Sequence, residues 1–206
     1  MKHFLWIGAL LLAVVACDTA QTQQKLPIYG RRYVEDGDTV YHTIPDFAFI
    51  NQDGDTLRKS DLLGQTVFVA DFFFTTCTTI CPKMKGQMMR LYQEFINNEE
   101  VMLLSHSIDP EYDTPEVLNT FAGQLGVSSE KWQFLSGVSQ EEMFAHGQQG
   151  YIVTATSDDS DPDGIMHSGA FLLVDKQGHI RGKYDGTVPI EVDRLMADIR
   201  LLLNEK

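Results

Sequence analysis

Apolar residues along this chain follow either the strand or the helix period, with one long continuous apolar run near the middle. Residues 66–74 are mostly β-branched or aromatic, as expected for a central strand covered on both faces. Apolar side chains recur at helical spacing over residues 83–97, namely at Met84, Met88, Leu91, Tyr92 and Phe95. The other predicted strands are 101–108, 132–135, 170–174 and 179–184, and the other predicted helices are 114–125, 140–147 and 189–203.

Turn signals separate these elements. Asp53-Gly54 predicts a hairpin between apolar segments near residues 47 and 57, and Gly126 ends the helix predicted over 114–125. Two short strands are also expected near residues 29–34 and 39–42, turning at Gly37. Strand and helix alternate, and an antiparallel hairpin and a last helix follow. This order predicts an α/β fold of the thioredoxin-like type, with a central mixed sheet flanked by helices.

The first residues have the pattern of an export signal. Lys2 is followed by an uncharged apolar run over residues 4–15, which is too short for a comfortable membrane span. The run ends in Val-Val-Ala before Cys17, which resembles the lipobox of bacterial lipoproteins, where that cysteine receives a diacylglycerol. A plain secretory signal with a chance cysteine is the alternative. The lipoprotein interpretation predicts attachment at the extracytoplasmic face of a bacterial membrane.

The predicted organisation has one folded domain. Residues 1–16 are expected to be a signal peptide, 17–44 the lipidated Cys17 with a tether and an N-terminal extension, and 45–206 the folded domain. Hydrophobic content of 43% and charged content of 22% are those of a soluble globular protein. The formal net charge of −13 argues against nucleic acid as a partner.

Two cysteines remain for chemistry once Cys17 is assigned to the anchor. The chain holds three cysteines, and Cys77 and Cys81 lie four positions apart. A disulfide closing so short a loop stabilises a fold little through chain entropy, so we expect the pair to serve chemistry. A helix beginning near Cys81 would bring both sulfurs to one side and favour thiolates. The three residues between the cysteines favour a soft metal ion bound by both sulfurs over rapid disulfide exchange. Formation of a disulfide between Cys77 and Cys81 is the alternative.

Four segments carry a resemblance to a known family. They are Thr-Thr-Cys-Thr-Thr-Ile-Cys-Pro at 75–82, Ser-Ile-Asp-Pro-Glu-Tyr-Asp-Thr-Pro at 107–115, Lys-Trp-Gln-Phe-Leu-Ser-Gly at 131–137, and His167-Ser168 followed by an apolar strand and Asp-Lys-Gln-Gly at 175–178. In this order, across roughly residues 45–206, they resemble the Sco/SenC family of copper proteins of cytochrome oxidase assembly. The four motifs together are highly specific.

The resemblance implies a copper site of Cys77, Cys81 and His167, holding one copper ion as Cu(I) or Cu(II). It further implies a metallochaperone that delivers copper to the binuclear CuA site of cytochrome c oxidase subunit II. Thiolates favour Cu(I), and an added imidazole allows Cu(II) to bind as well. Family members often have an acidic residue before this histidine, whereas this chain has Met166, which either contacts copper transiently or packs its loop.

Enzymatic functions compete with the chaperone hypothesis. In the first of these, Cys77 and Cys81 act as a thiol-disulfide oxidoreductase, which reduces the cysteines of cytochrome c oxidase subunit II before copper is inserted. Cys77, expected at the more exposed end, would be the attacking thiolate and Cys81 the resolving thiol. Both activities are compatible in one protein. A thiol peroxidase is a weaker hypothesis, because the sequence offers no single activated cysteine with a nearby arginine.

Several other residues invite functional interpretations that we discount. We expect His42, His146 and His179 at the surface, His106 packed in its strand, and Met84 and Met88 in the core.

The acidic loop 158–164 lacks the final glutamate of a calcium loop, and it either steers a partner or is a solvated turn. We expect Thr114 to cap a helix and therefore do not assign catalysis to its neighbours Asp109 and Asp113.

Overall fold

The computed structural model describes residues 25–158 and 160–205. The predicted signal peptide, Cys17 and most of the predicted tether lie outside these residues. The strands are β1 (Arg32–Glu35), β2 (Asp38–Tyr41), β3 (Ala48–Asn51), β4 (Thr56–Arg58), β5 (Val67–Phe73), β6 (Val101–Ser107), β7 (Trp132–Ser136), β8 (Ala155–Ser157), β9 (Ile165–His167), β10 (Ala170–Val174) and β11 (Ile180–Asp185). The helices are α1 (Lys59–Leu62), α2 (Cys81–Phe95), α3 (Pro115–Leu125), α4 (Gln140–Ala145), the π-helix η1 (His146–Tyr151) and α5 (Pro189–Leu203).

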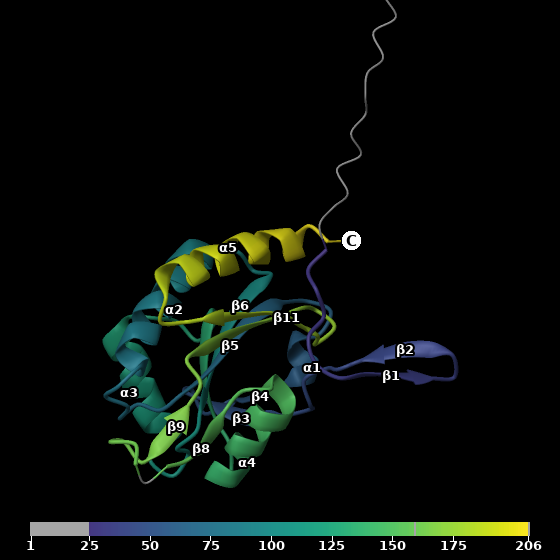
Figure 1. Cartoon of the computed structure of the whole chain (residues 1–206). Helices are drawn as coiled ribbons and strands as arrows, with labels where there is room; N and C mark the ends of the chain where they lie inside the picture. The colour runs from purple at the N-terminus through teal and green to yellow at the C-terminus, as the bar shows by residue number, and fades with distance from the viewer. Residues whose placement is uncertain (1–24, 159, 206) are drawn as a thin grey trace, which may run out of the picture.

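A seven-stranded mixed sheet forms the centre, in the order β11-β10-β5-β6-β7-β3-β4. Strands β5, β6 and β7 are parallel, and the outer strands pair antiparallel. All seven residues of β5 are buried, as the continuous apolar run predicts. The predicted α/β fold with a central mixed sheet flanked by helices is therefore confirmed (Figure 1).

Two apolar clusters cover the two faces of the sheet. One packs α2, α3 and α5 on one face, and Met84 and Met88 are fully buried within it, as predicted. The other contains Leu62 of α1 and Met143 of α4 on the opposite face. Since both faces are covered, the ends of the strands and their loops are left to carry a site.

Most predicted elements are confirmed, and their ends shift by a few residues. Helix α2 begins at Cys81, as expected from the cysteine pair and two residues before the apolar repeat of 83–97, with Pro82 in its first turn. Thr114 caps α3 by accepting a hydrogen bond from the Val117 amide, and Gly126 ends that helix in the left-handed conformation with φ of 68°. The β8–β9 hairpin, α1 and η1 were not predicted, because each is too short to show a period.

His146 departs from the sequence expectation. It was expected at the surface, but it is only 7% exposed and packs against Phe47, Phe49 and His106. The chain turns inward because α4 continues directly into the π-helix that starts at His146. Burial lowers the pKa of His146 to about 4. His106 is fully buried and stacks on Phe72, so its predicted packing role is confirmed.

The N-terminal part of the described chain is attached to the sheet near the C-terminus. Arg181 of β11 donates to the Leu26 carbonyl at 2.7 Å and to the Glu205 carboxylate at 2.7 Å. Glu205 in turn accepts from the Leu26 amide at 2.9 Å. We call these three residues the terminal clip. Beyond it, β1 and β2 form a separate hairpin that projects from the body of the molecule (Figure 1).

Candidate metal centre

The two cysteines lie on the loop that joins β5 to α2. Cys77 is in this loop, and its amide donates to the Phe74 carbonyl at 3.2 Å. Cys81 is the first residue of α2, and no side chain caps that helix. The Cys81 amide at the start of α2 contributes to lowering the pKa of the neighbouring Cys77, because a helix N-terminus favours an anion.

His167 reaches the cysteines from a distant segment. It is the last residue of β9, and its Nε2 lies 3.3 Å from Cys81 Sγ and 3.7 Å from Cys77 Sγ. The potential ligand atoms of the three residues all lie within 4.8 Å of one another. Within the described residues, this is the one group of three or more His, Cys, Asp or Glu side chains arranged in that way. The structure therefore brings together the three residues that sequence analysis singled out.

The histidine is held from two sides. The edge of its ring packs against Phe74, with the ring centroids 5.7 Å apart, and its Nδ1 lies 3.3 Å from the Ser168 carbonyl oxygen. An Nδ1–H donating to this carbonyl would leave Nε2 with a lone pair directed at the sulfurs, the tautomer that a metal ligand requires. Met166 beside it has a side chain that is 41% exposed.

The two thiols are electrostatically unequal. A hydrogen bond from the Cys81 thiol, with smaller contributions from His167 and Thr79, lowers the pKa of Cys77 to about 3. The same hydrogen bond, together with burial, raises the pKa of Cys81 well above its ordinary value. The metal-free pair thus holds one thiolate and one thiol at neutral pH, and Cys77 carries the charge.

The exposure of the cysteines is the reverse of the expected order. Cys77 was expected at the more exposed end, but it is only 8% exposed, whereas Cys81 is half-buried. Cys77 lies deeper because its amide bonds to the Phe74 carbonyl and its side chain joins the apolar cluster on the α4 face of the sheet. Attack by Cys77 would therefore depend on its low pKa rather than on exposure.

Asp113 anchors the start of the cysteine loop. This fully buried carboxylate accepts from the Thr75 amide at 3.1 Å, from the Thr75 hydroxyl, and from the Ser107 hydroxyl at 2.5 Å. Thr75 lies two residues before Cys77, so Asp113 fixes the loop at the point where it leaves β5. In the sequence, Asp113 is recognisable only as a neighbour of a helix cap, although the family-like segment 107–115 contains it.

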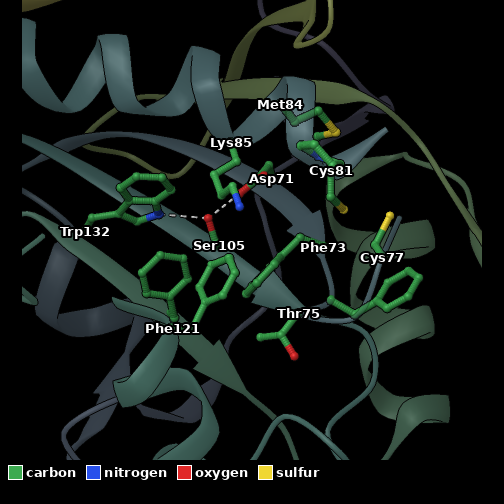
Figure 2. A pocket seen from close by; sticks show the side chains of 13 residues that line it. Asp71, Phe73, Thr75, Cys77, Cys81, Met84, Lys85, Ser105, Phe121 and Trp132 are labelled. Atoms are coloured by element: carbon green, nitrogen blue, oxygen red, sulfur yellow. Dashed lines mark hydrogen bonds between the residues drawn. The ribbon is translucent and has the colours of Figure 1, made fainter. Parts of the chain in front are cut away.

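A pocket lies beside the cysteine pair, on the side facing α2 and α3 (Figure 2). Both cysteines line it, together with Phe73, Lys85 and Phe121 among others. At its inner end, the Trp132 indole donates to Ser105 Oγ at 2.8 Å, and Ser105 donates to Asp71 at 2.5 Å (Figure 2).

Asp71 is the buried acid of this pocket. It belongs to β5, whose seven residues are all buried. Burial raises its pKa to about 6, against the opposing effect of the Ser105 hydrogen bond. Asp71 is not among the predicted site residues, although a single acidic residue inside a continuous apolar strand is itself a signal of a special environment.

The donor set fits copper. Two sulfurs and one imidazole nitrogen are soft to borderline ligands, and such ligands select Cu(I) and also accommodate Cu(II) or Zn²⁺. The partly exposed Cys81 leaves the group accessible from solvent. The arrangement of the three side chains can therefore bind a soft metal ion, and its two neighbouring thiols can also undergo disulfide exchange.

Comparisons with known proteins agree with the fold and the motifs. The sequence model described as SCO1/SenC matches residues 35–204. A SCO1 protein homolog from Bacillus subtilis is 32% identical over 164 residues, which cover 79% of this chain and 84% of the relative.

Solved structures give the same picture. A SCO1/SenC family lipoprotein from Bacillus anthracis superposes with a TM-score of 0.72 at 30% identity, over 79% of this chain and 96% of that one. BsSco, described as a Sco-family cytochrome c oxidase assembly protein with a disulfide switch, gives 0.71 at 30% identity, over 89% and 100%.

A more distant structure is that of Arabidopsis thaliana ScoI with copper bound, which has a TM-score of 0.62 at 23% identity, over 77% of this chain and 98% of that one. At 23% identity this similarity supports the fold alone. The family match over most of the chain and the 32% identity to the Bacillus subtilis relative are decisive. The chain belongs to the SCO1/SenC family.

Proposed function

We propose that this protein is a copper metallochaperone. It holds one copper ion through Cys77, Cys81 and His167 and delivers it to the CuA site of cytochrome c oxidase subunit II. The observation that carries the proposal is the convergence of the two thiols and the imidazole, whose ligand atoms lie within 4.8 Å of one another. Copper is the cargo in this function, not a resident cofactor.

Electrostatics supports binding at neutral pH. The pKa of Cys77, lowered to about 3, supplies one thiolate without any change in pH, so a metal ion has to displace only the proton of Cys81. Two thiolates suffice for Cu(I), and the imidazole extends the site to Cu(II). The ScoI protein of Arabidopsis thaliana, which shares the fold, holds copper in its solved structure.

Partial exposure supports transfer. Cys81 is half-buried, so a ligand from an acceptor protein can approach the metal there while Cys77 and His167 still hold it. Ligand-by-ligand replacement avoids releasing free copper and suits a chaperone. BsSco, described as a member of a family of cytochrome c oxidase assembly proteins, supports the choice of acceptor.

Thiol-disulfide exchange is the second candidate function. The Cys77 thiolate would attack a disulfide in the oxidase subunit, and Cys81 would resolve the mixed disulfide. The subunit's two sulfurs would be reduced to thiols, while Cys77 and Cys81 would be oxidised to a disulfide. The low pKa of Cys77 favours this reaction, and BsSco is described as having a disulfide switch.

We place the protein at the extracytoplasmic face of a bacterial membrane, attached through a lipid on Cys17. The signal-like run before Cys17 supports this location, and so does the description of the Bacillus anthracis relative as a lipoprotein. In the described part of the chain, none of the helices has the length and apolar content needed to span a bilayer.

Copper titration of the reduced full-length chain tests the chaperone function. We expect one copper per chain, and His167→Ala should weaken Cu(II) binding by at least about 100-fold, because losing a ligand exceeds the 10- to 100-fold effect of losing an outer contact. His42→Ala, which changes a histidine outside the site, is the matched control and should bind as the wild type does.

The two candidate functions give different results in this experiment. A chaperone loses Cu(II) in His167→Ala, while the oxidation of its thiols by a disulfide changes little. A pure reductase keeps its full activity in His167→Ala and binds no copper tightly in any variant. A wild-type stoichiometry near zero would contradict the chaperone function.

A further inference from the structure

The β8–β9 hairpin carries His167, and it is separate from the central sheet. Its strands pair Ala155 with His167 and Ser157 with Ile165, in a two-stranded sheet of their own. Figure 1 shows it at the end of the molecule opposite the C-terminus. His167 lies three residues before Ala170, the first residue of β10, so the hairpin and the start of β10 together set how far the imidazole lies from the two sulfurs.

One side chain of the hairpin tip contacts the loop between the cysteines. The Asp163 carboxylate accepts from the Thr78 amide at 2.9 Å and from the Thr78 hydroxyl at 2.8 Å. A weaker contact joins it to the Thr79 hydroxyl at 3.5 Å. Thr78 follows Cys77 directly, so the carboxylate bonds to the loop between the two sulfurs, across 85 positions of sequence.

The remaining polar contacts of the tip are internal. Asp158 accepts from the Ser160 amide and hydroxyl, and the Asp158 amide donates to the Gly164 carbonyl at 3.0 Å. Asp161 accepts from the Asp163 amide at 2.9 Å, which orients Asp163 toward Thr78. Among the described residues 158 and 160–164, Asp163 thus provides the hydrogen bonds between the tip and the cysteine loop.

We propose that Asp163 is a positioning residue that latches the β8–β9 hairpin onto the cysteine loop and so holds His167 within reach of both sulfurs. The copper part of this inference rests on the proposed function. The latch gives the site a closed state, with all three side chains together, and an open state, in which the hairpin withdraws His167 and leaves the cysteine pair. Because both hydrogen bonds are exposed to water, the latch can open without unfolding the domain.

The latch predicts different effects on the two oxidation states of copper. Asp163→Ala should weaken Cu(II) binding about tenfold, the range found when a group that orients a ligand is lost, and should reduce the thiolate-to-Cu(II) charge-transfer absorption. Cu(I) binding, which two thiolates dominate, should change less than about threefold. Competition titration of the full-length chain with each ion, together with its absorption spectrum, measures all three quantities.

Two further variants isolate the hydrogen bonds from the charge. Asp158→Asn removes one negative charge from the same tip but keeps the oxygen that accepts from Ser160, so it should bind copper as the wild type does. Asp163→Asn retains one acceptor oxygen for the Thr78 amide and should recover part of the loss. Equal weakening of Cu(II) binding by Asp158→Asn and Asp163→Ala would refute the proposed latch, because the loss of negative charge alone would then account for the effect.

A metal-free measurement tests the latch independently of copper. Hydrogen exchange of the Thr78 amide in the reduced, metal-free chain should accelerate at least about tenfold in Asp163→Ala, because the amide loses its acceptor. It should be unchanged in Asp158→Asn, and exchange in β5 should be unchanged in both variants. Unchanged Thr78 exchange in Asp163→Ala refutes the latch. If wild-type chain instead binds no copper while Thr78 exchange responds as expected, the latch stands and the chaperone function fails.

Discussion

Cys77 and Cys81 have the same side chain, but the protein gives their thiols opposite pKa shifts. Spacing in the sequence identifies the pair, and the helix that starts at Cys81 explains why a thiolate is favoured in this pair. It does not reveal which sulfur carries the charge, because that depends on hydrogen bonds from Cys81 and His167. Nor does spacing reveal exposure, since the fold of the loop determines which sulfur lies deeper.

Asp71 allows a pH test at the same scale. Its folded-state pKa of about 6 lies above its ordinary value of 3.8, so ionising it disfavours the folded state. Its contribution to stability is fully present below about pH 4 and is lost as the pH rises through about 6. Asp71→Asn cannot ionise, and it keeps an oxygen that can accept from Ser105.

Asp71→Asn should therefore stabilise the protein at neutral pH. Urea unfolding at pH 7.5 should show a gain in the free energy of unfolding of about 3 kcal/mol over wild type, converting the pKa shift at 1.4 kcal/mol per unit. At pH 4 the gain should nearly vanish. The same gain at both pH values would mean that packing, not ionisation, accounts for the effect.

At the scale of elements, the ends of β5 and β6 are joined by one carboxylate. Asp113 accepts from Thr75 beyond β5 and from Ser107 at the end of β6. Burial raises the pKa of Asp113, against the effect of these hydrogen bonds. Removing it would leave three donors unpaired in a buried place, and the cysteine loop would lose its anchor.

Asp113→Ala should destabilise the protein and disturb the cysteine pair together. We expect the free energy of unfolding to fall by about 2–4 kcal/mol, and the thiolate absorption of Cys77 to decrease at pH 5. The neighbouring Asp109→Ala removes a half-buried carboxylate and should lower stability by less than about 1 kcal/mol. Urea unfolding and ultraviolet absorption measure both effects, and equal losses in the two variants would refute the anchor.

The elements that sequence analysis missed are those that place His167. The motif identifies His167, but β8 and β9 have only three residues each, too few to show alternation. The π-helix before them is equally invisible, because it depends on how His146 and Tyr151 pack among aromatic rings. By contrast, β5, α2 and α5 are long and strongly periodic, and they were predicted within about two residues.

At the scale of the whole molecule, the order of elements was sufficient to predict the fold. Parallel strands joined by helices and closed by an antiparallel hairpin leave few topologies, and the observed mixed sheet is the thioredoxin-like one. The partners of the N-terminal segment could not be predicted. They depend on Arg181 and Glu205, which lie far away in sequence and carry no local signal of that contact.

The lipid anchor is tested on whole cells. Cys17→Ser should move the protein from the membrane fraction to the soluble extracytoplasmic fraction, because the proposed site of lipid attachment is lost. Copper binding by the released protein should be unchanged, since Cys17 is not part of the metal centre. Continued membrane association of Cys17→Ser would refute the lipoprotein assignment.

The terminal clip has a consequence for orientation. It holds the incoming chain at Leu26 beside the C-terminus, at the end of the molecule away from β8 and β9 (Figure 1). A protein held through residues upstream of the clip would therefore point its metal centre away from the surface that holds it. A pulling force on that upstream segment would act first on Arg181 and Glu205, so mechanical strain would reach the edge strand β11 before it reached Cys77, Cys81 and His167.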